Sequence, residues 1–361
     1  VEDGHDLQKI YTSIESATAE LSKNAKTPIC IVYKTIKGKG VKATELSSSG
    51  GHGYPLKAYD AKLIEMVNEI YDGKAPAELL AYAETAIKKP ITTATAAAST
   101  IKKEKVQPGL SRAAIRAASE GLPVFSVTSD LQGSTGIKAF QDKFPGRFVD
   151  VGIAEANMIS TAVGLSKHGI IPLVDTFAQF AITKGNLPLI MAGLSQGPVI
   201  GLFSHIGFQD AADGASHQSS TYLGATAGIP HVLTVQLSCS EEAEAYMYAA
   251  IKNHAEAKAK GQSPDTILFY FGREDHPVSY LANANYEWKK PQVLVKGSDA
   301  LLVAAGPMVD KALKAADELR SQGVSVTVVN HAFSNAPDVA VFSQLLRENH
   351  GRLITVEDHQ L

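Results

Sequence analysis

The sequence predicts an α/β protein with doubly wound, mostly parallel sheets that carry helices on both faces, followed by a smaller α/β domain. Two observations predict this fold. From residue 107 onward, short apolar runs that suit strands buried on both faces alternate with segments of helical periodicity. Small, polar and charged residues interrupt the chain at 89–106, and turn residues interrupt it again at 283–292.

Composition excludes several classes of protein. Apolar residues make up 45% of the 361 residues, which is enough for two or three cores. No apolar run reaches the length of about 18 residues that crosses a bilayer, and the net charge of -3 gives no global field that would favour a nucleic acid or an anionic membrane as partner. Cys30 and Cys239 form no Cys-x-x-Cys motif, which favours a reducing, cytoplasmic location. Because the sequence opens at Val1 without an initiator methionine or signal peptide, we expect it to be part of a longer protein.

The first 88 residues combine helices with a basic turn. Apolar spacing predicts a helix over 6–25, the run 28–33 predicts a buried strand, and 58–88 carries two further helical patterns. Between them lies Lys34-Thr-Ile-Lys-Gly-Lys-Gly40, whose glycines allow a ligand close to the backbone and whose lysines supply positive charge. By itself, this composition is more typical of a solvated turn.

The central part, 107–282, alternates strands and helices in the order of a doubly wound sheet. The predicted strands are 124–128, 149–153, 170–175, 199–204, 232–238 and 267–271. The predicted helices are 110–120, 137–144, 154–166, with Gly164 close-packed, and a long helix that opens at Ser240. Three elements of the last part are predicted strands, 300–305, 324–330 and 353–357, and two are predicted helices, 309–321 and 339–348.

Glu155 is the candidate for the chemistry. It follows the run Val149-Asp-Val-Gly-Ile153 and opens a predicted helix, where the helix dipole favours a free carboxylate. An apolar pocket would instead raise its pKa, so the sequence leaves the protonation of Glu155 open. The alternative is that Glu155 only caps the helix, which is the commoner role of an isolated glutamate at such a position.

Aromatic and imidazole groups follow two of the other strands. Phe177 and Phe180 are three residues apart, a spacing that by itself is typical of core packing. The loop after residue 204 holds His205, Asp213 and His217, and its spacing lacks the helical arrangement of a zinc site, so we expect no metal there. Several donors and acceptors in one loop suit a sugar, since each buried hydroxyl left unpaired costs about 1 to 3 kcal/mol.

Arg273 stands at the end of the strand that begins at Ile267. The planar guanidinium group matches the oxygens of a phosphate. The alternative is a surface salt bridge with Glu274 or Asp275.

Together these segments resemble the transketolase family of thiamine diphosphate enzymes. The family motif G-I-x-E stands here as Gly152–Glu155, T-F-x-x-F as Thr176–Phe180, and the sugar-binding loop as His205–His217. Three elements before residue 57 resemble the end of the family's diphosphate-binding domain: Asp3-Gly-His5, Lys34–Gly40 and Gly51–Leu56. The resemblance implies the thiamine diphosphate-binding fold. It divides the chain into the C-terminal part of the diphosphate-binding domain (1–88), a linker (89–106), the pyrimidine-binding domain (107–282), a linker (283–292) and part of the C-terminal domain (293–361).

The resemblance also implies roles for single residues. Glu155 would activate the cofactor, and Phe180, with Phe177 beside it, would stack on the aminopyrimidine. The other cofactor-binding residues would be Asp130, Leu131, Ile153 and Lys37. Proton transfer and sugar phosphate binding would involve His52, His205, His217, Asp213, Arg273 and Ser134.

The implied activity is that of a transketolase of the pentose phosphate pathway. Such an enzyme moves a two-carbon ketol unit from a ketose phosphate such as xylulose 5-phosphate to an aldose phosphate such as ribose 5-phosphate. It uses thiamine diphosphate with Mg²⁺ or Ca²⁺, whose protein ligands would lie outside this chain. The implied partners are sugar phosphates and a homodimer or hetero-assembly that supplies the missing diphosphate-binding segment, with no nucleic acid and no membrane.

Two departures from the family pattern accompany the resemblance. No G-D-G motif followed by an asparagine, which holds the metal and the diphosphate, occurs in the chain. The phosphate-binding arginine expected before Leu110 has no clear counterpart, because Pro108 falls near its place and Arg112 is four residues away.

Other functions stay open. The 1-deoxyxylulose-5-phosphate synthases and the beta subunits of 2-oxo acid dehydrogenases share the glutamate and aromatic elements. The loop with His205, Asp213 and His217 favours the transketolase branch, because sugar hydroxyls need such partners and pyruvate does not. A non-catalytic dimerising fragment of the same fold is the alternative of another class.

Overall fold

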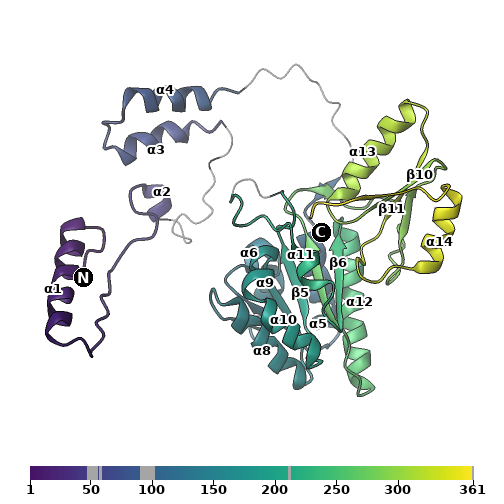
Figure 1. The fold of residues 1–361 in the computed structure, drawn as a ribbon, viewed down its shortest axis with the longest axis horizontal. Helices are drawn as coiled ribbons and strands as arrows, with labels where there is room; N and C mark the ends of the chain where they lie inside the picture. Colours follow the sequence, from purple (N-terminus) through teal and green to yellow (C-terminus); the bar gives the residue numbers. More distant parts are fainter. Residues whose placement is uncertain (47–55, 57–58, 90–101, 210–212, 360–361) are drawn as a thin grey trace. The chain divides into compact units, whose positions relative to one another are not determined.

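The structure is a computed structural model that describes residues 1–46, 56, 59–89, 102–209 and 213–359 (Figure 1). The chain divides into two compact units, residues 1–98 and residues 99–361. Most of the linker predicted at 89–106 and the predicted site residue His52 lie outside the described residues. None of the helices in the described ranges is long and apolar enough to cross a membrane.

The first unit is helical. Its helices are α1 (Leu7–Lys23), α2 (Lys42–Glu45), α3 (Lys62–Ile70) and α4 (Ala77–Ala86). Asp6 caps α1, because its carboxylate accepts hydrogen bonds from the backbone N–H groups of Gln8 and Lys9. The helices predicted over 6–25 and 58–88 are confirmed.

The strand predicted at 28–33 is wrong. No strand is assigned to this segment, and in the described part of the chain its backbone and that of Lys34 bond only to residues 1–4, through Val1 and Gly4. An apolar run becomes a buried strand only if neighbouring strands cover it, and Val32 is 68% exposed.

The second unit is built on a parallel sheet with the strand order β3-β2-β4-β5-β7-β6 in the described residues. Its strands are β2 (Val124–Thr128), β3 (Phe148–Asp150), β4 (Ile171–Phe177), β5 (Ile200–Ser204), β6 (Val232–Leu237) and β7 (Thr266–Phe271). All adjacent pairs run parallel. The predicted strands are therefore confirmed, except that β3 ends at Asp150, before the turn that leads to Glu155.

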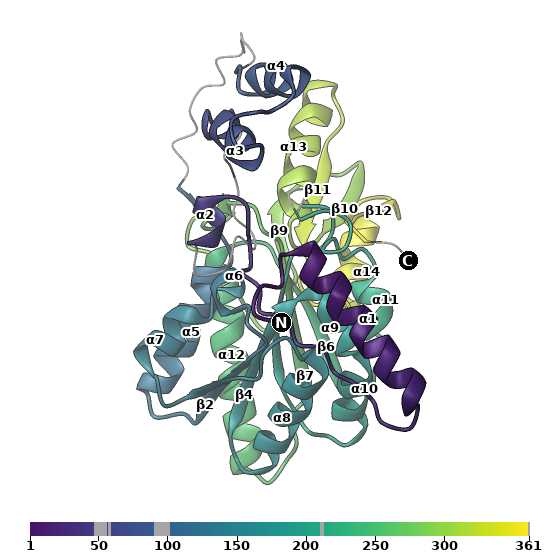
Figure 2. The same ribbon diagram turned by 90° about the vertical axis from the view of Figure 1, so that its left-hand side faces the viewer.

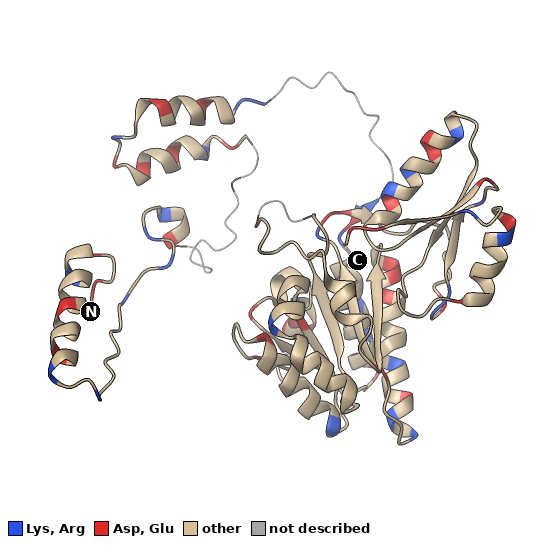
Figure 3. Cartoon of the chain, in the orientation of Figure 1, with Lys and Arg blue, Asp and Glu red and all other residues tan. Residues whose placement is uncertain are grey.

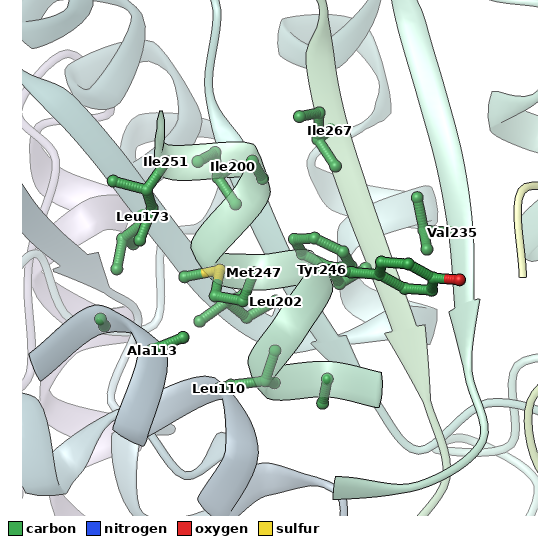
Figure 4. Packing of buried hydrophobic residues seen from close by; sticks show 14 of the residues in the cluster. Leu110, Ala113, Leu173, Ile200, Leu202, Val235, Tyr246, Met247, Ile251 and Ile267 are labelled. Atoms are coloured by element: carbon green, nitrogen blue, oxygen red, sulfur yellow. The ribbon is translucent and has the colours of Figure 1, made fainter. Parts of the chain in front are cut away.

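Helices cover both faces of this sheet (Figures 1 and 2). They are α5 (Gln107–Ser119), α6 (Gln132–Thr135), α7 (Lys138–Lys143), α8 (Glu155–Lys167), α9 (Ala178–Lys184), α10 (Asn186–Leu194), α11 (Tyr222–Thr226) and α12 (Ser240–Ala259). Successive residues of a strand face opposite cores, as Leu173 packs with α5 and α12 (Figure 4) whereas Val174 packs with α8, α9 and α10. This two-sided burial confirms the predicted fold class.

A smaller sheet follows, with the order β12-β10-β11-β9. It consists of β9 (Gln292–Val295), β10 (Ala300–Ala304), β11 (Val326–Asn330) and β12 (Leu353–Val356), together with α13 (Met308–Ser321) and α14 (Val339–Glu348). The antiparallel edge strand β9 was not predicted, because its four residues directly follow a turn-rich segment. Acidic and basic residues are interspersed along α13, which is typical of a solvated face (Figure 3).

Buried polar contacts join the two sheets of the second unit. Glu242, fully buried, accepts hydrogen bonds from the backbone N–H and hydroxyl of Ser238 and from the amide of Asn330 in β11. The segment after β11 bonds along β6, since the N–H of Gln236 donates to the carbonyl of Ala332. This segment therefore covers the edge of the parallel sheet that β6 would otherwise expose.

Two helical glycines give a stability test. A methyl group on Gly109 of α5 would overlap the backbone carbonyl of Ser240 at the start of α12, whereas nothing lies within 4 Å of a methyl group on Gly164 of α8. The expectation that Gly164 is close-packed is therefore wrong.

We predict that Gly109→Ala lowers the free energy of unfolding by about 1 to 3 kcal/mol, because overlap with a backbone atom forces α5 and α12 apart. Gly164→Ala, the matched control, raises it by about 0.5 to 1 kcal/mol, because alanine favours the helix. Urea unfolding followed by the fluorescence of Trp288, the one tryptophan of the chain, reports on this unit. Equal effects of the two substitutions would contradict the packing of α5 on α12.

Candidate active site

The predicted site residues of the second unit lie at one edge of the parallel sheet. Because its strands are parallel, all their carboxyl ends meet at this edge. Phe177 ends β4, His205 follows β5 directly, and Arg273 lies two residues after β7. Asp130 follows β2, and Glu155 comes after the short turn that ends β3.

Four rings form a cluster at this edge. The ring centroid of Phe177 lies 3.9 Å from that of His205, 5.6 Å from that of Phe180 and 5.6 Å from that of His217. Phe180 and His217 meet edge to face with their centroids 5.1 Å apart. Phe177 is buried among the other rings, whereas Phe180 is only half-buried, so Phe180 retains accessible surface on which a flat ligand can stack.

His205 is held in a neutral form. Its backbone has a φ of +65°, and its Nδ1 lies 2.7 Å from the hydroxyl oxygen of Ser204. Burial, with the nearby positive charge of Arg273, lowers the pKa of His205 to about 4, although Asp213 opposes this shift. At neutral pH the ring therefore has one donor and one acceptor nitrogen, of which Nδ1 bonds to Ser204.

Arg273 and Asp213 form an ion pair in the site. A guanidinium nitrogen of Arg273 lies 3.2 Å from the carboxylate of Asp213. The side-chain carbonyl of Gln209 accepts hydrogen bonds from the backbone N–H groups of Arg273 and Glu274, at 2.8 and 3.2 Å. The loop after β5 is therefore tied to the end of β7 at both Gln209 and Asp213.

Glu155 is the first residue of α8 and is 3% exposed. The turn before it is fixed by Asp150, whose carboxylate accepts hydrogen bonds from the backbone N–H groups of Gly152 and Asp130. Gly152 has a φ of +74°, which glycine adopts without strain. The predicted position at a helix start is confirmed, and Ile153 beside it is 79% exposed.

The loop after β2 is more ordered than predicted. Asp130 has a φ of +61°, and the short helix α6 follows Leu131 directly. Asp130 and Ser134 are exposed, and Leu131 is half-buried. Asp130 lies beside the turn that leads to Glu155, because the carboxylate of Asp150 bonds to the N–H groups of both Asp130 and Gly152.

Asp175 is a buried carboxyl group that the sequence analysis did not single out. It lies in β4 two residues before Phe177, and it accepts hydrogen bonds from the hydroxyl groups of Thr128 and Thr135 at 2.9 and 2.8 Å. Burial raises the pKa of Asp175 to about 7. An acidic residue inside an apolar strand was the signal that could have revealed it.

Lys105 is a second residue that the sequence analysis missed. Its segment forms β1 (Lys103–Glu104), which pairs with β8 (His276–Pro277) just beyond the end of β7. Lys105 is close enough to contribute to the lowered pKa of His205. Arg112, by contrast, binds Glu104 and Glu244.

Not every predicted site residue joins this cluster. Lys37 lies in an exposed turn of the first unit, which the structure describes separately from the second. Among the described residues, no group of three or more histidine, cysteine, aspartate or glutamate side chains is arranged to hold a metal ion.

The donor set fits the pyrimidine half of a thiamine cofactor. A half-buried ring in Phe180 suits a flat heteroaromatic group, and a buried carboxyl group in Glu155 suits its ring nitrogens. The neutral imidazole of His205 and the Asp213–Arg273 pair add hydrogen-bond donors and acceptors at the same edge of the parallel sheet.

Comparison with protein families identifies two domains in the chain. Residues 105–258 match the transketolase pyrimidine-binding domain, and residues 289–361 match the transketolase C-terminal domain. The chain belongs to the transketolase family. This membership implies dependence on thiamine diphosphate.

Known relatives extend the match beyond these two domains. Transketolase-like protein 2 of Homo sapiens is 30% identical over 99% of this chain and 56% of its own length. A 1-deoxy-D-xylulose-5-phosphate synthase of Clostridium acetobutylicum is 24% identical over 99% of this chain and 50% of its own length. The chain therefore spans about half the length of these relatives.

A solved structure is similar as well. A split-gene transketolase, described as an inactive beta4 tetramer, is 27% identical and has a TM-score of 0.59. The match covers 72% of this chain and 81% of that one.

We predict that Asp175 gives this transketolase-family chain a pH-dependent stability. Its pKa of about 7 in the folded chain exceeds its ordinary value of 3.8, so the folded state binds the extra proton and loses this stabilisation as the pH rises from about 4 to about 7. Asp175→Asn removes the effect, and the free energy of unfolding of the variant relative to the wild type should rise across this range. Urea unfolding followed by Trp288 fluorescence at several pH values measures it.

The buried histidines do not disturb the comparison of Asp175→Asn with the wild type. Burial lowers the pKa of His205 and His254 to about 4, which gives the opposite slope in both proteins and cancels in the difference. A difference between variant and wild type that does not change with pH would contradict the buried, protonated state of Asp175.

Proposed function

We propose that this chain is the pyrimidine-binding and C-terminal part of a transketolase that transfers a two-carbon ketol unit between sugar phosphates. The proposal is supported most by one observation: Phe180, His205 and His217 converge with the Asp213–Arg273 pair at the ends of β4, β5 and β7. When bound, thiamine diphosphate supplies the nucleophilic carbon and the electron sink of the reaction.

In this proposal, the carboxyl group of Glu155 determines the protonation state of the bound aminopyrimidine. Its carboxyl group donates or accepts a hydrogen bond at a ring nitrogen, and its burial excludes water that would compete for that bond. Phe180 orients the same ring by stacking, which contributes about 1 kcal/mol beyond burial. Ile153, Asp130 and Leu131 line the adjacent turns, and Lys37 is proposed to contact the diphosphate.

The other side chains recognise the sugar phosphate. His205, which is neutral, donates or accepts at a hydroxyl group, and His217 and His52 are proposed to bind or move protons at neighbouring oxygens. Asp213 accepts hydrogen bonds from hydroxyl groups, and Arg273 and Ser134 bind the phosphate. These pairings favour a polyhydroxylated substrate over pyruvate, which has fewer groups to match them.

The complete site needs a second segment. The chain spans about half of its relatives, and a similar split-gene transketolase is inactive as a beta4 tetramer. We therefore propose that a diphosphate-binding segment, in a homodimer or a hetero-assembly, supplies the ligands for Mg²⁺ or Ca²⁺ and completes the cofactor site. If no such assembly binds thiamine diphosphate, the alternative applies, and the chain is a non-catalytic fragment of the same fold.

Reconstitution tests the activity. The chain is combined with its diphosphate-binding segment, thiamine diphosphate and Mg²⁺, and the transfer from xylulose 5-phosphate to ribose 5-phosphate is measured. We expect ketol transfer by the assembly and none by the chain alone. Turnover of pyruvate without ketol transfer would instead assign the chain to the synthase branch.

Glu155→Gln tests the role of the carboxyl group. We predict that it lowers kcat by at least about a hundredfold, because the amide cannot exchange a proton with the pyrimidine. The matched control is Glu241→Gln, which changes an exposed glutamate in the first turn of α12 and should leave kcat within about twofold. Wild-type activity in Glu155→Gln would remove Glu155 from this role.

A further inference from the structure

The residues after β12 pack against the pyrimidine-binding domain. Asp358 and His359 are half-buried, and the side chain of His359 is 1% exposed and contacts the carboxylate of Glu357. The ring of His359 meets the ring of Tyr222 edge to face, with centroids 5.6 Å apart. A short segment of the C-terminal domain therefore packs beside α11, whose first residue is Tyr222.

The carboxyl group of Asp358 contacts both flanks of the loop that carries His205, Asp213 and His217. On one flank, a methyl group placed on Gly207 would overlap this carboxyl group, so its atoms pack directly against the Gly207 backbone. On the other flank, its Oδ1 accepts a hydrogen bond of 3.0 Å from the hydroxyl of Tyr222. Gly207 lies two residues after His205, and Tyr222 lies five residues after His217.

The contact with Gly207 requires glycine for two reasons. Gly207 has a φ of +61°, and any side chain at this position would displace Asp358. The N–H of Gly207 donates a hydrogen bond of 2.7 Å to the carbonyl of Ser219, which joins the beginning and the end of the loop. Asp358 thus packs against the point where the loop closes on itself.

The hydroxyl of Tyr222 lies between two acceptors. It is 2.6 Å from the side-chain carbonyl of Gln236 and 3.0 Å from Asp358, but it has a single hydrogen. Burial raises the pKa of Asp358, and the hydrogen bond from Tyr222 opposes this shift. Gln236 in turn bonds to Ser334, so the contact belongs to a network that joins β6 to the segment after β11.

We propose that Asp358 is a positioning residue by which the C-terminal domain fixes the loop that holds His205, Asp213 and His217. Asp358 touches none of these three side chains in the described contacts and acts on them through Gly207 and Tyr222. The inference rests on the geometry of the loop and does not need the proposed ketol transfer.

Hydrogen exchange tests the proposal on the whole chain without cofactor. Asp358→Ala should speed amide exchange in peptides covering 204–209 and 213–221 by about tenfold, while exchange in β10 and β11 stays unchanged. Asp358→Asn, which keeps the shape and one acceptor, should restore most of the protection. Asp317→Ala, the matched control, removes an exposed carboxylate of the same domain and should change neither region.

Two outcomes overturn the proposal. Exchange of the loop in Asp358→Ala could equal that of the wild type, or it could rise together with that of β10 and β11, which would mark a general loss of stability. If Asp358→Ala does not fold, Tyr222→Phe removes the hydroxyl and keeps the ring, and it should speed exchange in the same two peptides only.

A kinetic test of Asp358 depends on the proposed function. In the reconstituted assembly, Asp358→Ala should raise KM for the sugar phosphate about tenfold and lower kcat less, because loop order affects binding first. Loss of kcat alone, with KM unchanged, would contradict a positioning role. If Glu155→Gln kept full activity, the proposed function would fail, whereas the exchange result would still decide the role of Asp358.

Discussion

Parallel pairing of β4 with β5 and of β5 with β7 determines where the candidate active site lies. The three strands are adjacent in the sheet although residues 178–199 and 205–265 separate them in the sequence. Their pairing brings Phe177, His205 and Arg273 to one edge, because each follows or ends one of these strands. Both faces of the strands are buried under helices, so the register cannot slip without exposing one core to water.

Polar side chains around this edge of the sheet fix the segments that carry the site residues. Asp175 bonds to threonines of β2 and α6 below the ring cluster, and Asp150 fixes the turn before Glu155. Gln209 ties the loop after β5 to the end of β7, and Asp358 approaches the same loop from the C-terminal domain. The loop after β5 is therefore held both from the end of β7 and from the C-terminal domain.

The sequence predicted the sheet well because its strands are apolar runs that need cover on both faces. Glu155 was predicted at a helix start from the residues before it, and the convergence of Phe180, His205 and His217 followed from the resemblance to transketolases. The catalytic roles of these residues stay predictions. The strand expected at 28–33 failed, because hydrophobicity alone does not say whether neighbouring strands exist.

Other features depend on tertiary contacts that periodicity does not encode. Lys105 follows a run of charged residues typical of a linker, and only the pairing of β1 with β8 brings it beside β7. Asp358 is three residues from the end of the sequence, and nothing in its neighbours shows that it packs against Gly207. Such contacts join segments more than 100 residues apart.

The structure of the assembled protein with bound thiamine diphosphate is the most direct test of the central claim. We expect the aminopyrimidine to stack on Phe180 and to lie within hydrogen-bonding distance of the Glu155 carboxyl group, at the edge of the sheet where His205 and His217 lie. A pyrimidine bound away from Phe180, or a Glu155 carboxyl group that points away from it, would contradict the account.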